Sequence, residues 1–513
     1  MLRATERRCS DADPVARPGP DSHDDDSHDD DSHDDDYQSI PSREDVESAL
    51  SAEDNLVTFD GPDDPANPLN WSRRAKWTAT ILVSSFTFVS PIASTMLSPS
   101  LPDLEDEFGT SGFETNLIMS IFLLAYAIGP FIIAPLSEMY GRVVVLQSSN
   151  MVFLLFNTVC GFSKTKAEIM VFRFLSGLGG AAPQAIGSGV LSDCWSADER
   201  GGAVAIYSLA PFLGPVIGPI AGGYLTQYIS WRWIFWAISI LDAVVQVLAL
   251  FFLPETYRPA ILAKKARRLR RSTGNKNYLT EVEAANRTWA ALFRKSIVRP
   301  LIMLTTQPTI QITGLYRGYL YGLMYLVLAS FPAVWKDKYD QEPGRASLNY
   351  ISLGIGTLVA NRSLQTYKHL KEKHNTTGCP EYRIPLMFPT AIIAPSGLLL
   401  YGLAAHYEVH WIVPNIGTAI FAMGLILSFQ CAQTYIIDCY ETYAASAAGA
   451  SAFMRTMAGF GFPLFANKLY ESLGIAGGNG LLAGVAFGIC LVVSSILWKY
   501  GKWIRKKSPY CAG

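Results

Sequence analysis

The sequence predicts an all-α polytopic membrane protein in which twelve transmembrane helices form two six-helix halves. Half of the 513 residues are apolar, only 17% are charged, and the charged residues leave long uncharged runs. An apolar run of about 20 residues is long enough to span a bilayer as an α-helix. Six such runs precede a polar basic segment and six follow it, which is typical of membrane proteins built from two repeated halves.

The first 75 residues are expected to form a disordered cytoplasmic tail. Residues 1–70 carry 21 acidic and 5 basic side chains, and Asp21–Asp36 repeats Asp-Ser-His-Asp-Asp with small variation. Such a segment contains too little apolar surface to fold. Weak binding of divalent metal is one interpretation of its histidines and aspartates. Repeat expansion in a solvated tail is the favoured one, so no metal site is predicted.

The predicted spans follow the uncharged runs in order. The N-terminal half, residues 76–254, contains spans at 77–97, 117–136, 143–161, 167–190, 203–224 and 233–253. The C-terminal half, residues 310–500, contains spans at 310–332, 347–365, 384–404, 411–432, 444–466 and 480–499. The second span of this half is short and rich in glycine, which makes it the weakest of the twelve signals.

The connections between the spans predict the orientation. Residues 255–309 form a central loop, of which residues 255–298 hold eleven Lys and Arg against three Glu. Basic connections stay in the cytoplasm, so both termini, including the tail 501–513, are predicted to be cytoplasmic. A basic loop can also indicate nucleic acid. Its place between two membrane halves favours anionic lipid headgroups, and no nucleic-acid partner is expected.

The fifth span carries two stripes at helical spacing. Glycines recur every four residues and let a neighbouring helix approach closely, while prolines at the same interval bend the helix and free carbonyl groups. A bent, closely packed helix suits a joint between moving parts. The residues of the two stripes are Pro211, Gly214, Pro215, Gly218, Pro219, Gly222 and Gly223.

This span resembles the helix 5 signature of drug:proton antiporters of the major facilitator superfamily, G-P-x-x-G-P-x-x-G-G. Other stretches look like the fungal twelve-span branch, among them the lead-in Asp64–Trp71 and Pro254-Glu-Thr-Tyr257. The resemblance covers about residues 55–505. It implies the major facilitator fold, alternating access between two halves, and inward proton flow that drives outward substrate movement. We expect the fifth span to pack against the opposite half as hinge and seal.

The connection after the second span contains a candidate conformational latch. Glu138 and Arg142 are four residues apart, and Gly141 permits a tight turn between them. A carboxylate and an arginine at this spacing can hold two helix ends together. The stretch resembles the superfamily signature G-x-L-x-D-R-x-G-R-R, with fewer charges. An ordinary cytoplasmic turn is the alternative.

Only four ionisable side chains lie clearly inside the spans, and each is costly in hydrocarbon. Arg173 begins a stretch similar to the helix 4 signature R-x-x-x-G-x-G, in which the arginine is associated with proton coupling. Asp242 is the acidic residue near mid-span and the candidate proton carrier, with a structural hydrogen-bonding role as the alternative. Arg455 lies in a stretch that resembles helix 11 of the fungal family. Arg317 is either a substrate contact or held by backbone carbonyls.

Polar and aromatic side chains of the second half predict a substrate cavity. Amides and phenols in an otherwise apolar cavity orient amphipathic organic molecules without tight specificity. Most aromatic residues of these spans will nevertheless pack against helices or lipid. The predicted cavity residues are Gln311, Tyr316, Arg317, Tyr319, Gln430, Gln433 and Arg455.

Several function classes lack their motifs. The chain contains no G-x-x-x-x-G-K-[ST], H-E-x-x-H or G-x-S-x-G, so neither ATP-driven pumping nor catalysis is predicted. We expect a monomeric efflux transporter for drugs, toxins or a fungal metabolite, with the proton gradient as energy source and no cofactor. A proton symporter for uptake of a vitamin or polyamine, and a non-transporting sensor, are the alternatives. The expected location is the plasma membrane, with the vacuolar membrane as the alternative.

Overall fold

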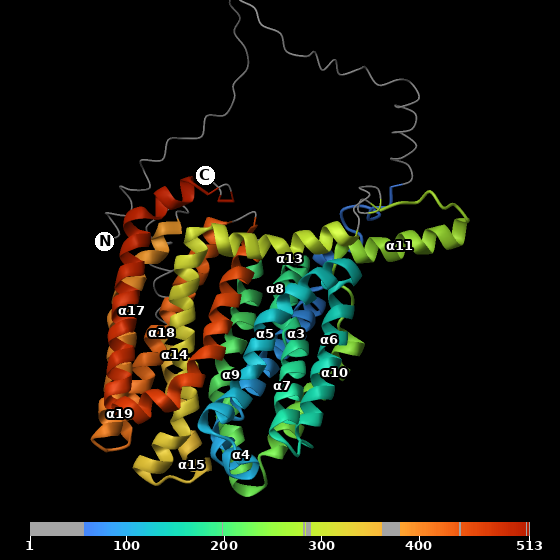
Figure 1. Ribbon diagram of the computed structural model, residues 1–513. Coiled ribbons are helices and arrows are strands. Elements are labelled where there is room, and N and C mark those ends of the chain that lie inside the picture. Colours follow the sequence, from blue (N-terminus) through green and yellow to red (C-terminus); the bar gives the residue numbers. More distant parts are fainter. Residues whose placement is uncertain are drawn as a thin grey trace, which may run out of the picture.

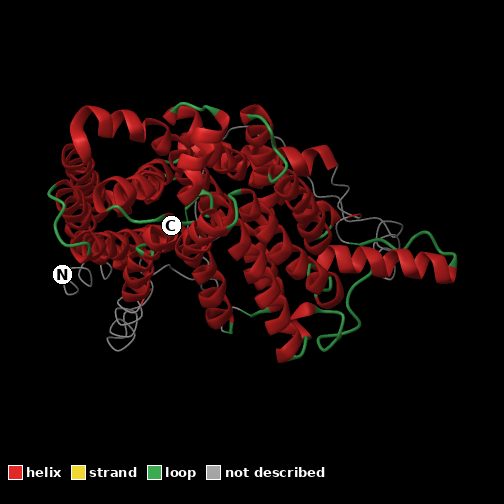
Figure 2. Ribbon diagram, turned by 90° about the horizontal axis from the view of Figure 1, so that it is seen from below, coloured by secondary structure: helices red, strands yellow, loops and turns green. Residues whose placement is uncertain are grey.

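The computed structural model describes residues 56–196, 199–280, 283, 289–361, 380–440, 443–508 and 510–511. Helices form the body of this part of the chain and run side by side as one bundle (Figures 1 and 2). The acidic, histidine-containing repeat and most of the connection at 366–383 lie outside the described residues.

The N-terminal half contains the predicted first six spans. The fourth span consists of two helices, because the chain leaves helical hydrogen bonding at Ala181 and restarts with Pro183 in the first turn. The helices are α3 (Arg73–Thr95), α4 (Leu101–Phe108), α5 (Gly112–Tyr140), α6 (Arg142–Cys160), α7 (Lys166–Gly180), α8 (Ala182–Cys194), α9 (Arg200–Tyr228) and α10 (Arg232–Phe252), with the short 3-10 turns η1 (Pro68–Asn70) and η2 (Ser98–Ser100).

The C-terminal half contains the remaining spans. Residues 351–361 are helical and lie within the predicted span 347–365. The last two predicted spans lie in α19, in which two helical segments meet at a kink at Gly474. The φ of 67° at Gly474 suits a residue without a Cβ. The elements are α14 (Pro308–Tyr339), α15 (Pro343–Leu348), η3 (Pro380–Leu386), α17 (Met387–His406), α18 (Ile412–Cys439) and α19 (Ala444–Lys506).

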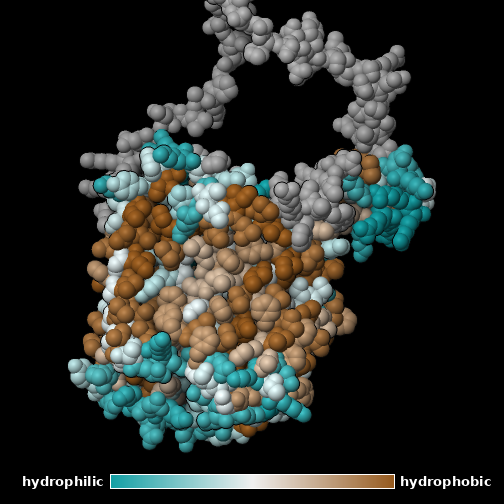
Figure 3. Space-filling view, viewed as in Figure 1, coloured by the Kyte–Doolittle hydropathy of each residue, from teal (hydrophilic) through white to brown (hydrophobic). Residues whose placement is uncertain are grey.

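The surface of the bundle matches a bilayer. Ten helices of the described chain are long and apolar enough to cross a membrane. One of these helices, α19, contains two of the predicted spans, and the helical residues 351–361 belong to a further predicted span. The described helices are therefore consistent with the twelve-span fold. On the face shown in Figure 3, apolar residues cover the middle of the molecule and polar residues lie at both ends.

Two helices of the central segment lie across one end of the bundle. They are α11 (Arg258–Thr273) and α13 (Trp289–Thr306), and they run roughly at right angles to the spanning helices (Figure 1). Helix α11 has the sequence Arg-Pro-Ala-Ile-Leu-Ala-Lys-Lys-Ala-Arg-Arg-Leu-Arg-Arg-Ser-Thr, so this end of the molecule is strongly basic. The opposite end carries α4 and α15. These two ends are called the α11–α13 end and the α4–α15 end below.

Candidate functional site

The two halves are joined by hydrogen bonds at the α4–α15 end. The Ser98 hydroxyl donates to the carbonyl oxygen of Leu328 at 2.5 Å and lies 2.9 Å from the Tyr350 hydroxyl. The Gln227 side chain donates to Glu342 at 2.6 Å and accepts from the backbone of the α15 helix at 2.8 Å. The structure therefore represents a state in which the halves are closed at this end.

The glycine stripe of α9 packs against α3 of its own half. A Cβ atom on Gly214 would lie 2.5 Å from the Pro91 side chain, and one on Gly218 would lie 2.8 Å from the Thr95 hydroxyl. A Cβ atom on Gly222 would overlap the carbonyl oxygen of Met96. Because these positions admit no side chain, the two backbones approach as closely as small-residue membrane interfaces allow.

The opposite half meets α9 at other residues. The fifth span is expected to pack against the opposite half, and Gly223 does so, against Ser347 of α15, whereas Gly214, Gly218 and Gly222 face α3. Pro215 lines a small apolar cavity of about 20 Å³, enclosed by α9, α14, residues 351–361 and α18. Pro219 is buried and Pro211 half-buried. Helix α9 thus packs on α3 through Gly214, Gly218 and Gly222, and on the other half through Gly223 and Pro215.

Two arginines of the second half lie against Phe429, whose ring meets Phe212 of the first half. Arg317 of α14 lies with its guanidinium 4.2 Å from the ring centroid of Phe429 on α18. Arg455 of α19 lies 5.4 Å from the same ring and 4.9 Å from the ring of Tyr321. Arg455 also donates to the side chain of Gln184 on α8, at 2.9 Å, and so connects the halves.

Neither of these two arginines has a counterion among the residues that the structure describes. Arg317 is 1% exposed and donates to the Ser451 hydroxyl at 2.7 Å, and neither arginine forms an ion pair within the described ranges. The Nε atoms of both are buried without an acceptor there. An unsatisfied buried donor costs about 1–3 kcal/mol, and arginine stays charged. Cation–π contacts compensate only part of this cost. The arrangement is suited to an incoming acceptor.

The other predicted cavity residues are spread over several places. Tyr316 is fully buried inside the second half, and Tyr319 donates to the carbonyl oxygen of Leu482 on α19. Gln311 donates to the carbonyl oxygens of Leu304 and Thr305 at 3.0 and 2.7 Å, where α13 joins α14. In the described structure, no side chain of these three forms a hydrogen bond with Arg317 or Arg455.

Two predicted amides lie on α18 next to the arginine pair. Gln430 and Gln433 are half-buried and follow Phe429 toward the α11–α13 end of the helix. The structure thus brings Arg317 and Arg455 together around Phe429. It leaves the two amides beside this group along the same helix.

Arg173 holds helices of the first half together. Its guanidinium donates to the carbonyl oxygens of Ala93, Ile118 and Met119, at 2.9, 3.3 and 3.0 Å. Ala93 belongs to the last turn of α3, where carbonyl groups lack partners within the helix. No carboxylate of the described residues pairs with Arg173. In this state Arg173 therefore caps the C-terminal end of α3 and connects α7, on which it lies, to α3 and α5.

Asp242 faces α6 inside the first half. The Asn150 amide donates to both of its carboxyl oxygens, at 3.1 and 2.9 Å, and to Gln246 at 3.1 Å. The side chain is fully buried, and it forms no ion pair in the part of the chain that the structure describes. A buried carboxyl group with an amide as its partner is costly in the charged form, which favours a proton on it.

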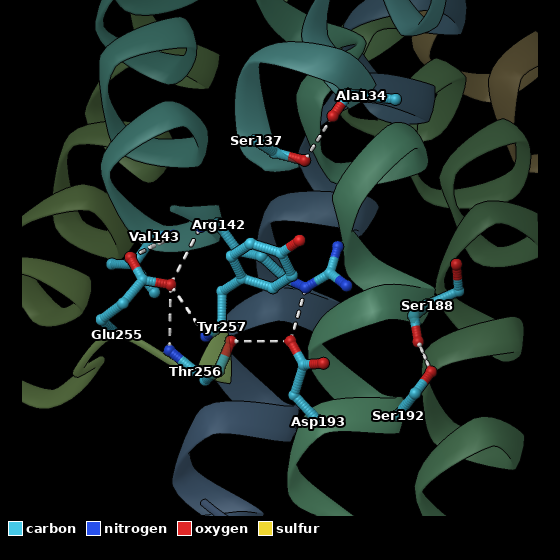
Figure 4. A network of polar contacts seen from close by, with 10 residues as sticks. All are labelled: Ala134, Ser137, Arg142, Val143, Ser188, Ser192, Asp193, Glu255, Thr256 and Tyr257. Carbon is cyan, nitrogen blue, oxygen red and sulfur yellow. Dashed lines mark hydrogen bonds and ion pairs between the residues drawn. The ribbon is translucent and has the colours of Figure 1, made fainter. Parts of the chain in front are cut away.

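The candidate latch is a polar network at the α11–α13 end (Figure 4). The Arg142 side chain donates to Asp193, at the end of α8, at 2.5 Å. The Glu255 carboxylate accepts from the backbone N–H groups of Arg142 and Val143 at 2.9 and 3.2 Å, and so caps the first turn of α6. It also accepts from the backbone of Thr256 at 3.1 Å.

Gly141 makes this arrangement possible. Its φ of 105° is unfavourable for other residues, and a Cβ atom there would lie 2.5 Å from the Glu255 carboxylate. The Arg142 guanidinium also lies 5.0 Å from the ring of Tyr257. Burial raises the pKa of the Tyr257 phenol, so this group stays protonated at neutral pH. Of the predicted latch residues, Gly141 and Arg142 lie in this network. The Glu138 carboxylate lies close enough to Tyr257 to raise the pKa of its phenol further.

The second half contains a matching pair. Arg383 of η3 donates to Asp438, near the end of α18, at 3.0 Å. Like Arg142 and Asp193, it joins the connection after the second span of its half to the end of the fourth span. Arg505 of α19 pairs with Glu381 in the same region. The two halves thus repeat one device at the same end of the molecule.

Removing either member of the Arg142–Asp193 pair is expected to slow transport and lower stability. Both side chains are mostly buried, so each single loss leaves an uncompensated charge. Thermal unfolding of Arg142→Ala, Asp193→Ala and the double variant should give a coupling free energy of about 0.5–3 kcal/mol. The exposed Asp337→Ala serves as the control. Additive effects of the two single changes would contradict a latch role.

Sequence reasoning missed several of these residues. Phe429 and Gln184 gave no signal, since phenylalanine and isolated amides are common in membrane helices. Asp193 and Glu255 lie in the stretches Ser192-Asp-Cys-Trp and Pro254-Glu-Thr-Tyr257, which carry family resemblance. Their charge opposite to Arg142 at the same membrane face was the signal available.

Known proteins resemble this chain over most of its length. The sequence profile of the Major Facilitator Superfamily matches residues 83–463. The efflux pump vrtL of Penicillium aethiopicum is 43% identical, over 93% of this chain and 94% of its own. An uncharacterised transporter of Schizosaccharomyces pombe, C1529.01, is 41% identical over 91% and 96%. Among solved structures, the proton:xylose symporter XylE of E. coli superposes with a TM-score of 0.61 at 14% identity, over 84% and 96%.

Proposed function

The chain belongs to the major facilitator superfamily, and we propose that it is a proton-coupled antiporter that exports small organic molecules. The observation that carries this proposal is a polar and aromatic group of the second half, Arg317, Arg455 and Phe429, which meets the first half at Gln184 and Phe212. Hydrogen bonds also join the two halves at the α4–α15 end. A site at the interface of two repeats is exposed alternately when the halves rock. The name of the relative at 43% identity supports export.

The proposed orientation in the membrane rests on the charges at the two ends of the molecule. The basic helix α11 and the latch lie at one end, which the positive-inside rule assigns to the cytoplasm. The closed α4–α15 end then faces outside, and both termini are cytoplasmic. Substrate would enter from the cytoplasm or inner leaflet in a state like this one, and leave after the halves have closed at the α11–α13 end and opened at the α4–α15 end.

Helix α9 is proposed as the joint of this movement. It is fixed to α3 by its glycines and touches α15 and the α18 side through Gly223 and Pro215. A helix rigidly attached to one half can carry a sealing surface against the other as the halves rock. The same signature is the basis for antiport over symport.

Arg173 and Asp242 are proposed to couple protons to the movement. Asp242 lies buried between α6 and α10, where its charged form is costly, so uptake and release of a proton would accompany a change in its access to water. Arg173 fixes α3, α5 and α7 and would transmit their displacement. The two residues thus take different parts, one as carrier and one as positioning residue.

Asp242→Asn is expected to remove the dependence of export on an inward proton gradient. Asparagine keeps the size of the side chain but carries no exchangeable charge. Substrate exchange that does not depend on the gradient should continue, because the proposed substrate-binding residues Arg317, Arg455 and Phe429 lie in the other half. Export measured against the imposed pH difference checks this. An unchanged pH dependence in the variant would exclude Asp242 as the carrier.

The overall proposal is tested in vesicles that contain the purified full chain. Vesicles are loaded with candidate drugs, toxins and fungal metabolites, and the outside is made acidic while substrate release and internal pH are followed. Release that is matched by internal acidification supports antiport. Accumulation on the side to which protons flow indicates uptake symport. Binding without any flux indicates a sensor, and either result overturns the proposal.

The surroundings of the protein are proposed from the same features. The plasma membrane is the expected location, with the vacuolar membrane as alternative, and anionic headgroups are the expected partner of helix α11. We propose a monomer that needs the proton gradient and no cofactor.

A further inference from the structure

The group between the halves has an unbalanced positive charge. Arg317 comes from α14 and Arg455 from α19, and both guanidinium groups lie against the Phe429 ring, at 4.2 and 5.4 Å. Two like charges near one ring repel each other in a medium of low dielectric constant. Such a pair persists only where a counterion or a function requires it.

The protein supplies no counterion in the described chain. The other ionisable residues inside the spans lie away from this group. Each guanidinium nitrogen of Arg173 donates to a carbonyl oxygen of α3 or α5, and Asp242 accepts from Asn150 between α6 and α10. The remaining hydrogen bonds of the pair go to neutral groups, Ser451 and Gln184.

Each arginine keeps an unused donor. The Nε atoms of Arg317 and Arg455 are both buried without a hydrogen-bond acceptor in the residues described. Guanidinium groups present planar donor pairs that match a carboxylate. Two such groups beside one ring are suited to receive an anion, because an anion would neutralise the pair and could accept from a vacant donor.

Aromatic and apolar side chains border this arginine pair. The Phe429 ring meets Phe212 of α9 edge to face at 6.1 Å and Tyr321 of α14 at 6.2 Å. Beyond Phe212 lies the small apolar cavity that Pro215 and Met324 also line, on the side of the α4–α15 end. An inorganic ion would leave these surfaces unused, whereas a molecule with an acidic group and an aromatic body would contact both.

We propose that the substrate class of this transporter is an amphipathic organic anion, bound by its acidic group between Arg317 and Arg455 with its ring system against Phe429 and Phe212. This inference rests on the proposed export function and specifies its substrate. The acid is a carboxylate or an acidic phenol, and the cavity widens around its apolar body as the halves move.

The charge of the substrate sets the energetics of export. An anion that leaves a cell with an inside-negative potential moves in the favourable direction, and a proton that enters in exchange does the same. Export of such an anion is therefore electrogenic. It should accelerate when a potassium diffusion potential makes the interior of loaded vesicles negative.

The test compares probes that share an apolar body and differ in the charge of their polar group. Benzoate, 1-naphthaleneacetate and pyrenebutyrate are each compared with the corresponding amide and primary amine, and inorganic phosphate serves as the purely ionic probe. Binding to the full chain in lipid nanodiscs is followed by thermal unfolding, and export is followed in vesicles. We expect the larger acids alone to stabilise the protein. Equal stabilisation by the amides, a preference for the amines, equal stabilisation by phosphate, or no effect of any acid would overturn the proposal.

Variants assign the effect to the two arginines. Arg317→Gln and Arg455→Gln should each weaken binding of the acids at least about tenfold, because a charge-assisted hydrogen bond is lost. Arg317→Lys and Arg455→Lys should retain part of the affinity for the acids, because lysine keeps the charge but not the planar donor pair. Where a glutamine variant fails to fold, the partial loss of acid binding in the lysine variant tests the role of that arginine. Lys338→Gln, which removes a charge at the α4–α15 end, is the control. Unchanged acid binding in the arginine variants would refute the assignment.

Two outcomes separate this inference from the export proposal. Acids that bind through the arginines but never cross the membrane would leave the anion site standing and refute export. Amines that are exported in exchange for protons would leave export standing and refute the anion site.

Discussion

Gly218→Leu is expected to abolish transport while the protein still inserts into the membrane. A Cβ atom at this position already meets the Thr95 hydroxyl at 2.8 Å and the Ile92 carbonyl oxygen at 3.2 Å. A leucine must therefore push α9 away from α3, because the neighbouring atoms include backbone of α3, which cannot move aside as a flexible side chain would. Overpacking of this kind costs about 1–3 kcal/mol, and helix separation would also disturb the contacts of Gly223 and Pro215 with the other half.

The measurement is export from vesicles that contain equal amounts of folded protein, together with thermal unfolding in detergent. Gly484→Leu is the matched control, because Gly484 lies on α19 with no atom within 4 Å of an added Cβ. The control should transport at the wild-type rate. Wild-type export by Gly218→Leu would show that close packing of α9 on α3 is dispensable.

The sequence was informative about this helix up to a definite point. Spacing alone shows that Gly214, Gly218 and Gly222 share one face, and absence of side chains there indicates a close neighbour. Nothing in the spacing identifies the neighbour. The partner is α3 of the same half, and it became known only from the tertiary arrangement, because local periodicity contains no information about which distant segment packs on a face.

The twelve spans were predictable for a physical reason. Backbone groups in lipid must be satisfied within the segment, so an apolar run of bilayer length becomes a helix whatever its neighbours are. The breaks were harder to predict. The interruption at Gly474 and the junction at Ala181 depend on local backbone geometry within long apolar stretches, where composition changes little.

The charged residues show the same limit more sharply. Cost in hydrocarbon singles out Arg173, Asp242, Arg317 and Arg455, but it does not say what satisfies each of them. Arg173 bonds to carbonyl groups and Asp242 to an amide, whereas Arg317 and Arg455 share a phenylalanine ring. Carbonyls and rings are present along every span, so these partners are not visible in the sequence.

The four residues therefore divide between the halves. Those of the first half are satisfied by their own half, and those of the second half keep unused donors at the contact between the halves. This division suggests that selectivity for substrate and coupling to protons lie in different halves. Variants of the two pairs should then alter different properties, affinity in one case and pH dependence in the other.

Arg173→Ala is expected to abolish coupled export and to lower stability substantially. The change leaves the carbonyl oxygen of Ala93, in the last turn of α3, without its donor, and removes the links to the carbonyl oxygens of Ile118 and Met119, which keep their helical bonds within α5. An unsatisfied buried group costs about 1–3 kcal/mol, and the lost side chain leaves a cavity as well. Export under a pH gradient, surface expression and thermal unfolding measure the three consequences separately. We expect the variant to reach the membrane in reduced amount and to show no gradient-driven flux.

Arg173→Lys distinguishes the two explanations of that loss. Lysine keeps the positive charge, but its single ammonium group cannot reproduce a planar fork that reaches α3 and α5 together. If Arg173 positions these helices, the lysine variant stays impaired although its charge is intact. Recovery of full coupled export by lysine would instead assign Arg173 a role through its charge alone. Normal coupled export by Arg173→Ala would remove the residue from the coupling scheme, and the proton pathway would then have to run through Asp242 without it.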